Sequence, residues 1–124
     1  MFSEKESKSM DRIETLIGEQ CNIVGNLSGE GLIKIDGSVE GDLTWQDDII
    51  LGSSALYKGN ITCRNATLFG RVRGNVICDE SLIIESTGKV SGDITVKNII
   101  IKEGGCLDGK CTMVVSKNIN EILD

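Results

Sequence analysis

The sequence predicts an all-β fold, a single-domain parallel β-helix of about six three-sided coils with short flexible termini. Three observations predict it: a repeat of about 17 residues, apolar and polar residues alternating within each repeat, and glycine with Asn or Asp between the apolar pairs. A repeat this short, alternating with period two, indicates strands and leaves no room for two helices. Stacking such repeats buries a continuous apolar interior that one repeat cannot bury alone.

Two phrases recur in step along the chain. The first is an apolar residue, any residue, glycine, Asn or Asp, and a second apolar residue, with glycines at 25, 41, 59, 74, 92 and, in a degenerate copy, 109. The second phrase is an alternating apolar pair that ends at Ile17, Ile35, Leu51, Leu68, Ile84 and Ile101. Because the phrases keep step through six copies, each copy is expected to form one coil.

Each coil is expected to hold three short strands, taken here from the second repeat. The first strand contains Ile33 and Ile35, the second is centred on Val39, and the third contains Leu43 and Trp45. Glycine, Asn and Asp form the corners, because these residues tolerate positive φ at little cost. The coiled core is predicted over residues 15–115, between a charged, flexible N-terminal tail (1–14) and a short C-terminal tail (116–124).

Composition excludes several classes of function. The chain has no histidine, which excludes catalysis by Ser-His-Asp or Cys-His and zinc sites that use histidine. Its net charge of −6 argues against a nucleic-acid partner. Five cysteines without a CxxC pair are interpreted as free thiols that act as small core residues. We therefore predict no enzyme activity, no cofactor and no metal site.

The two ends of such a rod are the first candidate site. Terminal coils expose unpaired backbone groups and apolar residues, and neither flanking segment is long enough to form a robust cap. The sequence therefore predicts end-to-end assembly of the chain with itself into a filament, without nucleotide, since no phosphate-binding loop is recognised. The predicted contact residues are Leu16, Ile17 and Ile23 at one end and Leu107, Met113 and Val115 at the other.

The chain resembles the bactofilins, a family of bacterial cytoskeletal proteins. The resemblance covers about Ile13 to Met113 and rests on IETLIGEQCNIVGNL, on IKIDGSVEGDL (Ile33 to Leu43) and on the closing GKCTM. It implies a right-handed β-helix that polymerises without nucleotide into non-polar filaments. It also implies a cytoplasmic scaffold at the inner face of the membrane that supports cell-shape, cell-wall or motility proteins.

The N-terminal residues MFSEK resemble a short membrane-targeting segment found in part of that family. Met1 and Phe2 are suited to insertion at the bilayer interface, and Lys5 and Lys8 to the lipid headgroups. One copy is expected to bind weakly, but a filament presents many copies, so avidity makes attachment stable. An inert tail is the alternative for this segment.

An outward column of the first strands is the last candidate site. Ile50, Ile83 and Ile100 fall in it, and three isoleucines on an outer face are unusual. They form a candidate partner face, although β propensity alone also explains them. The alternative function is therefore a binding module that uses this isoleucine face and does not polymerise.

Overall fold

The computed structural model describes residues 13–114 of the chain. The predicted tails lie almost wholly outside this range, and so do the candidate residues Met1, Phe2, Lys5, Lys8 and Val115. The described part consists of 18 strands and contains no helix. The predicted all-β fold class is confirmed.

The strands form three parallel six-stranded sheets, because each strand pairs with the strand three places further along the chain. Sheet A contains β1 (Ile13–Ile17), β4 (Leu32–Ile35), β7 (Asp48–Leu51), β10 (Asn65–Leu68), β13 (Ser81–Ile84) and β16 (Asn98–Ile101). Sheet B contains β2 (Asn22–Val24), β5 (Ser38–Glu40), β8 (Leu56–Lys58), β11 (Arg71–Arg73), β14 (Lys89–Ser91) and β17 (Cys106–Asp108). Sheet C contains β3 (Leu27–Gly29), β6 (Leu43–Trp45), β9 (Ile61–Cys63), β12 (Val76–Cys78), β15 (Ile94–Val96) and β18 (Cys111–Met113).

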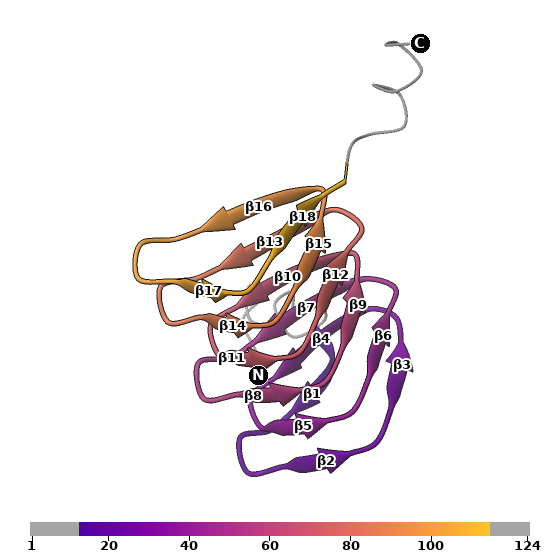
Figure 1. The fold of residues 1–124 in the computed structure, drawn as a ribbon. Helices are drawn as coiled ribbons and strands as arrows, with labels where there is room; N and C mark the ends of the chain where they lie inside the picture. Colours follow the sequence, from indigo (N-terminus) through magenta and orange to yellow (C-terminus); the bar gives the residue numbers. More distant parts are fainter. Residues whose placement is uncertain (1–12, 115–124) are drawn as a thin grey trace, which may run out of the picture.

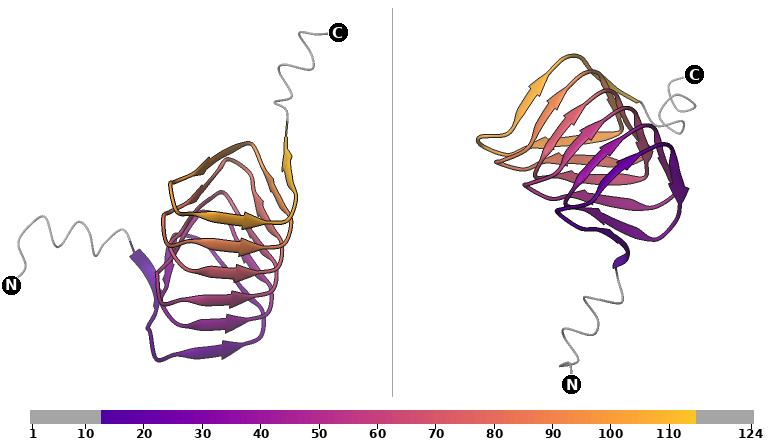
Figure 2. Two further views of the ribbon diagram at one scale, coloured as in Figure 1. Left: turned by 60° about the vertical axis from the view of Figure 1, so that its left-hand side comes forward. Right: turned by 90° about the horizontal axis from the view of Figure 1, so that it is seen from below.

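Six triangular coils therefore rise in a right-handed sense from β1 at one end to β18 at the other (Figures 1 and 2). At the usual strand spacing the stack is roughly 30 Å long. The observed register matches the repeat in the sequence: Ile33 pairs with Ile49, Ile35 with Leu51, and Val39 with Tyr57. One irregularity, a bulge between Ile13 and Thr15, bends the start of β1.

The core fills the inside of the triangle with columns of aliphatic side chains. Its two aromatic members satisfy their polar atoms on the backbone of the preceding coil. The hydroxyl of the buried Tyr57 donates a hydrogen bond to the Gly41 carbonyl at 2.7 Å. The indole Nε1–H of Trp45 donates to the Gly31 carbonyl at 2.6 Å. The described residues contain no buried side-chain nitrogen or oxygen without a partner.

The glycine of the first phrase is required by the close approach of successive coils. At Gly74, φ is +144°, and a Cβ built there would lie 2.0 Å from the carbonyl oxygen of Gly59 in the coil below. The same contact recurs from coil to coil at this corner, which explains why the glycine persists while its neighbours vary.

The Asn or Asp after each glycine supports the same corner. The side-chain oxygen of Asn60 accepts a hydrogen bond from the Asn75 amide, and that of Asn75 accepts one from the Asp93 amide. This ladder satisfies backbone donors, and residues 13–114 hold no group of three or more Cys, Asp or Glu side chains placed to bind a metal.

The interpretation of the cysteines as core residues is correct for only two of the five. Cys63 and Cys78 are buried and stacked, with their Sγ atoms 3.6 Å apart and no disulfide between them. Cys21, Cys106 and Cys111 are exposed. Cys21 and Cys111 lie in the first and last coils, where one neighbouring coil is missing, whereas Cys106 pairs with Lys89 and lies on the outer face of sheet B. The interpretation is therefore wrong for these three cysteines.

Candidate self-association surfaces

Both ends of the rod present open sheet edges. Within residues 13–114, β1, β2 and β3 each pair with one strand, and so do β16, β17 and β18. The outer edge of each of these strands therefore carries backbone N–H and C=O groups without a strand partner. Such an edge is a template for pairing with another chain.

The C-terminal mouth, defined as Ile99, Ile101, Leu107, Cys111 and Met113, also exposes the apolar interior. Ile101 continues the column of Ile84, yet Ile84 is fully buried whereas Ile101 is 46 % exposed. Met113 continues the column of Val96 and is 48 % exposed, whereas Val96 is fully buried. These side chains are uncovered because no seventh coil lies above them within the described part of the chain. A second rod stacked on this mouth would restore the missing contacts.

The N-terminal mouth, defined as Ile17, Ile23 and Leu27, is more closed. Ile17 is only 6 % exposed, while Ile23 and Leu27 are partly buried and pack on the core. The indole of Trp45 lies against Gly29 of the first coil: a Cβ built at Gly29 would be 2.7 Å from the ring. The large ring thus fills the place of an inward side chain that Gly29 lacks.

The six predicted contact residues do not all lie in the two mouths. Ile17 and Ile23 line the N-terminal mouth, and Leu107 and Met113 line the C-terminal mouth. Leu16 is 61 % exposed and pairs with Lys34, so it lies on the outer face of sheet A. Ile101 is an addition to the predicted set, although its place as the last member of the alternating apolar column is visible in the sequence.

The outer face of sheet A carries the predicted isoleucines and one groove. Ile50, Ile83 and Ile100 share a column, but Thr67 lies between Ile50 and Ile83, so the apolar stripe is interrupted. Only Ile100 is largely exposed.

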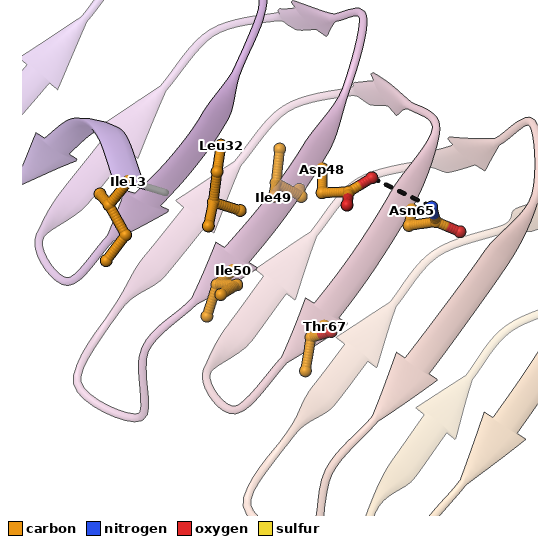
Figure 3. Close-up of a pocket in the computed structure, with 7 residues that line it drawn as sticks. All are labelled: Ile13, Leu32, Asp48, Ile49, Ile50, Asn65 and Thr67. Carbon is orange, nitrogen blue, oxygen red and sulfur yellow. Dashed lines mark hydrogen bonds between the residues drawn. The ribbon is translucent and has the colours of Figure 1, made fainter. Parts of the chain in front are cut away.

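The groove on this face has a volume of about 350 Å³ and lies around β4, β7 and β10 (Figure 3). Ile13, Leu32 and Ile50 make its apolar end. The other end is polar, since the side chain of Asn65 donates a hydrogen bond to Asp48 at 3.0 Å. The outer face of sheet A therefore carries a half-polar groove rather than a continuous apolar stripe.

Two buried groups of the core have raised pKa values. Burial, helped by the charge of Asp42, raises the pKa of the Tyr57 hydroxyl. The hydrogen bond with Cys78, followed by burial, raises the pKa of the Cys63 thiol. A protonated, buried thiol is a poor nucleophile, so Cys63 is inert rather than reactive.

Comparison with known proteins identifies this architecture. A family profile described as "Bactofilin: Polymer-forming cytoskeletal" matches residues 15–112. The chain belongs to the bactofilin family of polymer-forming cytoskeletal proteins. Its curated relatives include two bactofilins of Myxococcus xanthus (strain DK1622).

The first of these, bactofilin BacP, is 32 % identical over 114 residues, which is 91 % of this chain and 48 % of BacP. The chain thus spans about half the length of that relative. Bactofilin BacO is 28 % identical over 99 residues, 80 % of this chain and 79 % of BacO. The fold matches a cryo-EM reconstruction of Thermus thermophilus bactofilin double helical filaments with a TM-score of 0.73. That match has 18 % sequence identity and covers 81 % of this chain and 99 % of the Thermus chain.

Family membership agrees with a structural rather than an enzymatic role. The open strand edges at both mouths and the exposed apolar side chains of the C-terminal mouth are the kind of surface that a polymer-forming protein needs. Among residues 13–114 there is no helix of the length and hydrophobicity needed to cross a membrane.

Proposed function

We propose that the chain assembles end to end, without nucleotide, into non-polar filaments that line the cytoplasmic membrane. There the filament would serve as a scaffold for cell-shape, cell-wall or motility proteins. The observation that carries the proposal is the C-terminal mouth, where the inward columns stop with Ile101 and Met113 about half exposed. Burying each half-exposed side chain in a stacked neighbour contributes on the order of 1 kcal/mol. Backbone hydrogen bonds formed between the open strand edges of the two chains would add to this stabilisation.

Independence from nucleotide is supported by the nature of these contacts, which need no bound cofactor. Residues 104–110 match the spacing GxxxxGK of a phosphate-binding loop, but Cys111 stands where that loop has Ser or Thr. The segment runs through β17 into β18, and no helix N-terminus is there to hold phosphates.

Substitution at the C-terminal mouth tests the filament. Ile101→Arg or Leu107→Arg would place an unpaired charge in the contact, so filaments in negative-stain micrographs should shorten to small oligomers. Ile77→Arg is the matched control, because Ile77 is 44 % exposed on the outer face of sheet C, away from either mouth. Filaments of normal length in both mouth variants would disprove the C-terminal contact.

Native cysteines test whether the filament is non-polar. Cys21 marks the N-terminal coil, and Cys106 and Cys111 mark the C-terminal coil, all exposed. Each single-end variant keeps the exposed cysteines of only one terminal coil. If like ends meet, a short thiol cross-linker should convert either variant to dimers. If unlike ends meet, neither single-end variant should cross-link, and only the unmodified chain should give ladders. Cys63 and Cys78 are buried and should not react.

The second candidate is a binding module that uses the outer face of sheet A and does not polymerise. The groove beside Ile50 is the observation that favours it. Size-exclusion chromatography separates the two proposals. A concentration-independent monomer peak supports the module, whereas elution in the void volume supports the filament.

Membrane attachment is proposed through Met1, Phe2, Lys5 and Lys8, which lie outside the described residues. Phe2→Glu should weaken the binding of the filament to anionic liposomes in a sedimentation assay, because the phenyl ring is the larger apolar group offered to the bilayer. Unchanged sedimentation would argue for an inert segment.

A further inference from the structure

The outer face of sheet B gathers four cations on three successive strands of a chain whose net charge is −6. Lys58 ends β8, Arg71 and Arg73 flank the inward Val72 of β11, and Lys89 begins β14. All four side chains are exposed on strands that Figure 1 shows side by side. This group is called the sheet B cluster below.

The register brings the four cations together. Arg71 pairs with Lys89 across one strand boundary, and Arg73 pairs with Lys58 across the other. Ser91 lies opposite Arg73 on β14. Arg71, Arg73, Lys89 and Ser91 surround a shallow hollow of about 60 Å³ that also touches Val72 of β11. Three cations and one hydroxyl group therefore converge on one small space.

The positive charge of this cluster is not neutralised by the rest of the described chain. None of its cations forms an ion pair with any residue from 13 to 114, since the four ion pairs found there use Lys34, Arg64, Lys97 and Lys102. The acidic residues on this face, Glu40 and Asp108, lie at the two margins, opposite Lys58 and Ser91. An anion at the centre of the cluster would thus meet cations on three sides.

The chemistry of the cluster fits a phosphate group. Guanidinium groups bind phosphate oxygens through pairs of parallel hydrogen bonds, lysine adds a point charge, and a serine hydroxyl adds a donor. We propose that the sheet B cluster binds phosphate groups and that, in the filament, it docks on the phosphates of an anionic lipid bilayer.

The shape of the site favours a bilayer over a small soluble phosphate. The hollow is shallow and open, so a single phosphate binds there more tightly than chloride but too weakly to be held at low concentration. Sheet B is a layered face of short parallel strands (Figure 2), which can lie along an extended surface of charge. This part of the inference rests on the proposed filament, which would repeat the cluster along the rod, on average once per chain length of roughly 30 Å. Repetition converts weak single contacts into stable attachment.

The test is co-sedimentation of the full chain with vesicles of phosphatidylcholine and phosphatidylglycerol in equal amounts. The site variant is Arg71→Gln/Arg73→Gln/Lys89→Gln. The control variant is Lys34→Gln/Lys97→Gln/Lys102→Gln, which removes the same amount of charge from other faces. Each cation near an anionic surface is worth roughly fivefold in affinity, so the site variant should bind on the order of 100-fold more weakly. The control should change binding only modestly.

Further arms separate lipid binding by this cluster from lipid binding by the N-terminal segment and from effects on assembly. All variants are also made with Phe2→Glu, so that the proposed N-terminal contact does not mask the cluster. Electron micrographs check filaments for each variant, so that loss of assembly is distinguished from loss of lipid binding. If the site variant does not assemble, inorganic phosphate on the unmodified chain is the second test. It should displace the vesicles more strongly than chloride at equal ionic strength.

Three results would overturn the proposal. The first is equal vesicle binding by the site and control variants. The second is equal displacement by phosphate and chloride. The third is binding to double-stranded DNA through the same three residues without binding to vesicles, which would assign the cluster to a different polyanion.

Discussion

Replacing a single corner glycine by alanine should separate contact between coils from backbone strain. Gly74 and Gly25 occupy equivalent corners and have similar φ values, +144° and +139°. Their surroundings differ, because a Cβ at Gly74 would lie 2.0 Å from the Gly59 carbonyl oxygen, whereas a Cβ at Gly25 would meet nothing within 4 Å. Gly25→Ala is therefore a matched control that keeps the strain and removes the clash.

The magnitude follows from these distances. Strain at such a φ costs about 1–3 kcal/mol in either variant. In Gly74→Ala the two coils must also separate by more than about 1 Å to reach ordinary contact. That movement breaks two hydrogen bonds that join these coils beside the corner, from the Gly59 amide to the Arg73 carbonyl at 2.9 Å and from the Ile61 amide to the Asn75 carbonyl at 2.8 Å. Losing two backbone hydrogen bonds adds about 2–3 kcal/mol.

Urea unfolding followed by the fluorescence of Trp45, the one tryptophan in the sequence, measures the difference. With a slope of about 2 kcal/mol per molar urea, the midpoint of Gly74→Ala should lie about 1–1.5 M below that of Gly25→Ala. Both are compared at one protein concentration, because assembly stabilises the folded chain. Equal midpoints would show that the approach of successive coils does not require glycine.

Three further predictions concern the interior. Trp45→Phe should lower the free energy of unfolding by about 2 kcal/mol in urea titrations, because it leaves the Gly31 carbonyl without its donor and opens a void. Tyr57 has a raised pKa in the folded chain, so its hydroxyl keeps its proton when the unfolded chain has lost it. Stability should therefore fall as the pH rises above about 10, and less steeply in Tyr57→Phe; identical slopes would contradict this assignment. Cys63 and Cys78 should resist alkylation in native buffer and react in urea, as mass spectrometry would show.

Much of the fold follows from the sequence because every coil of a solenoid has a similar pattern of apolar, polar and small residues. The spacing of Ile33, Ile49 and Ala66 predicts their column correctly, since a strand's two-residue period and a fixed coil length leave one register that buries every apolar pair. The same logic places Leu107 and Met113 at the last coil.

Residues at the ends are harder to place from sequence. Leu16 is apolar and early in the chain, which predicts an end contact, but its pairing with Lys34 turns it outward. Cys106 is exposed for the same reason, since it pairs with Lys89 on the outer face of sheet B, whereas Cys21 and Cys111 are exposed because a neighbouring coil is missing. Position in the repeat determines whether a residue joins an inward or an outward column, and the number of neighbouring coils determines whether an inward residue is covered.

The sheet B cluster is also only partly predictable from the sequence. The residue before each corner glycine runs Val24, Glu40, Lys58, Arg73, Ser91 and Asp108, so its charges are visible in the repeat. The convergence of Arg71 and Lys89 on the same hollow depends on the register of β11 and β14.

The sequence by itself determined the coil, its three strands and the small corner, because period, propensity and steric size are local properties. The tertiary structure alone decided which columns lose their cover at the rod's ends and which exposed charges come together without a counter-charge. Both features depend on residues about one coil apart in the sequence, which become neighbours only when the coils stack.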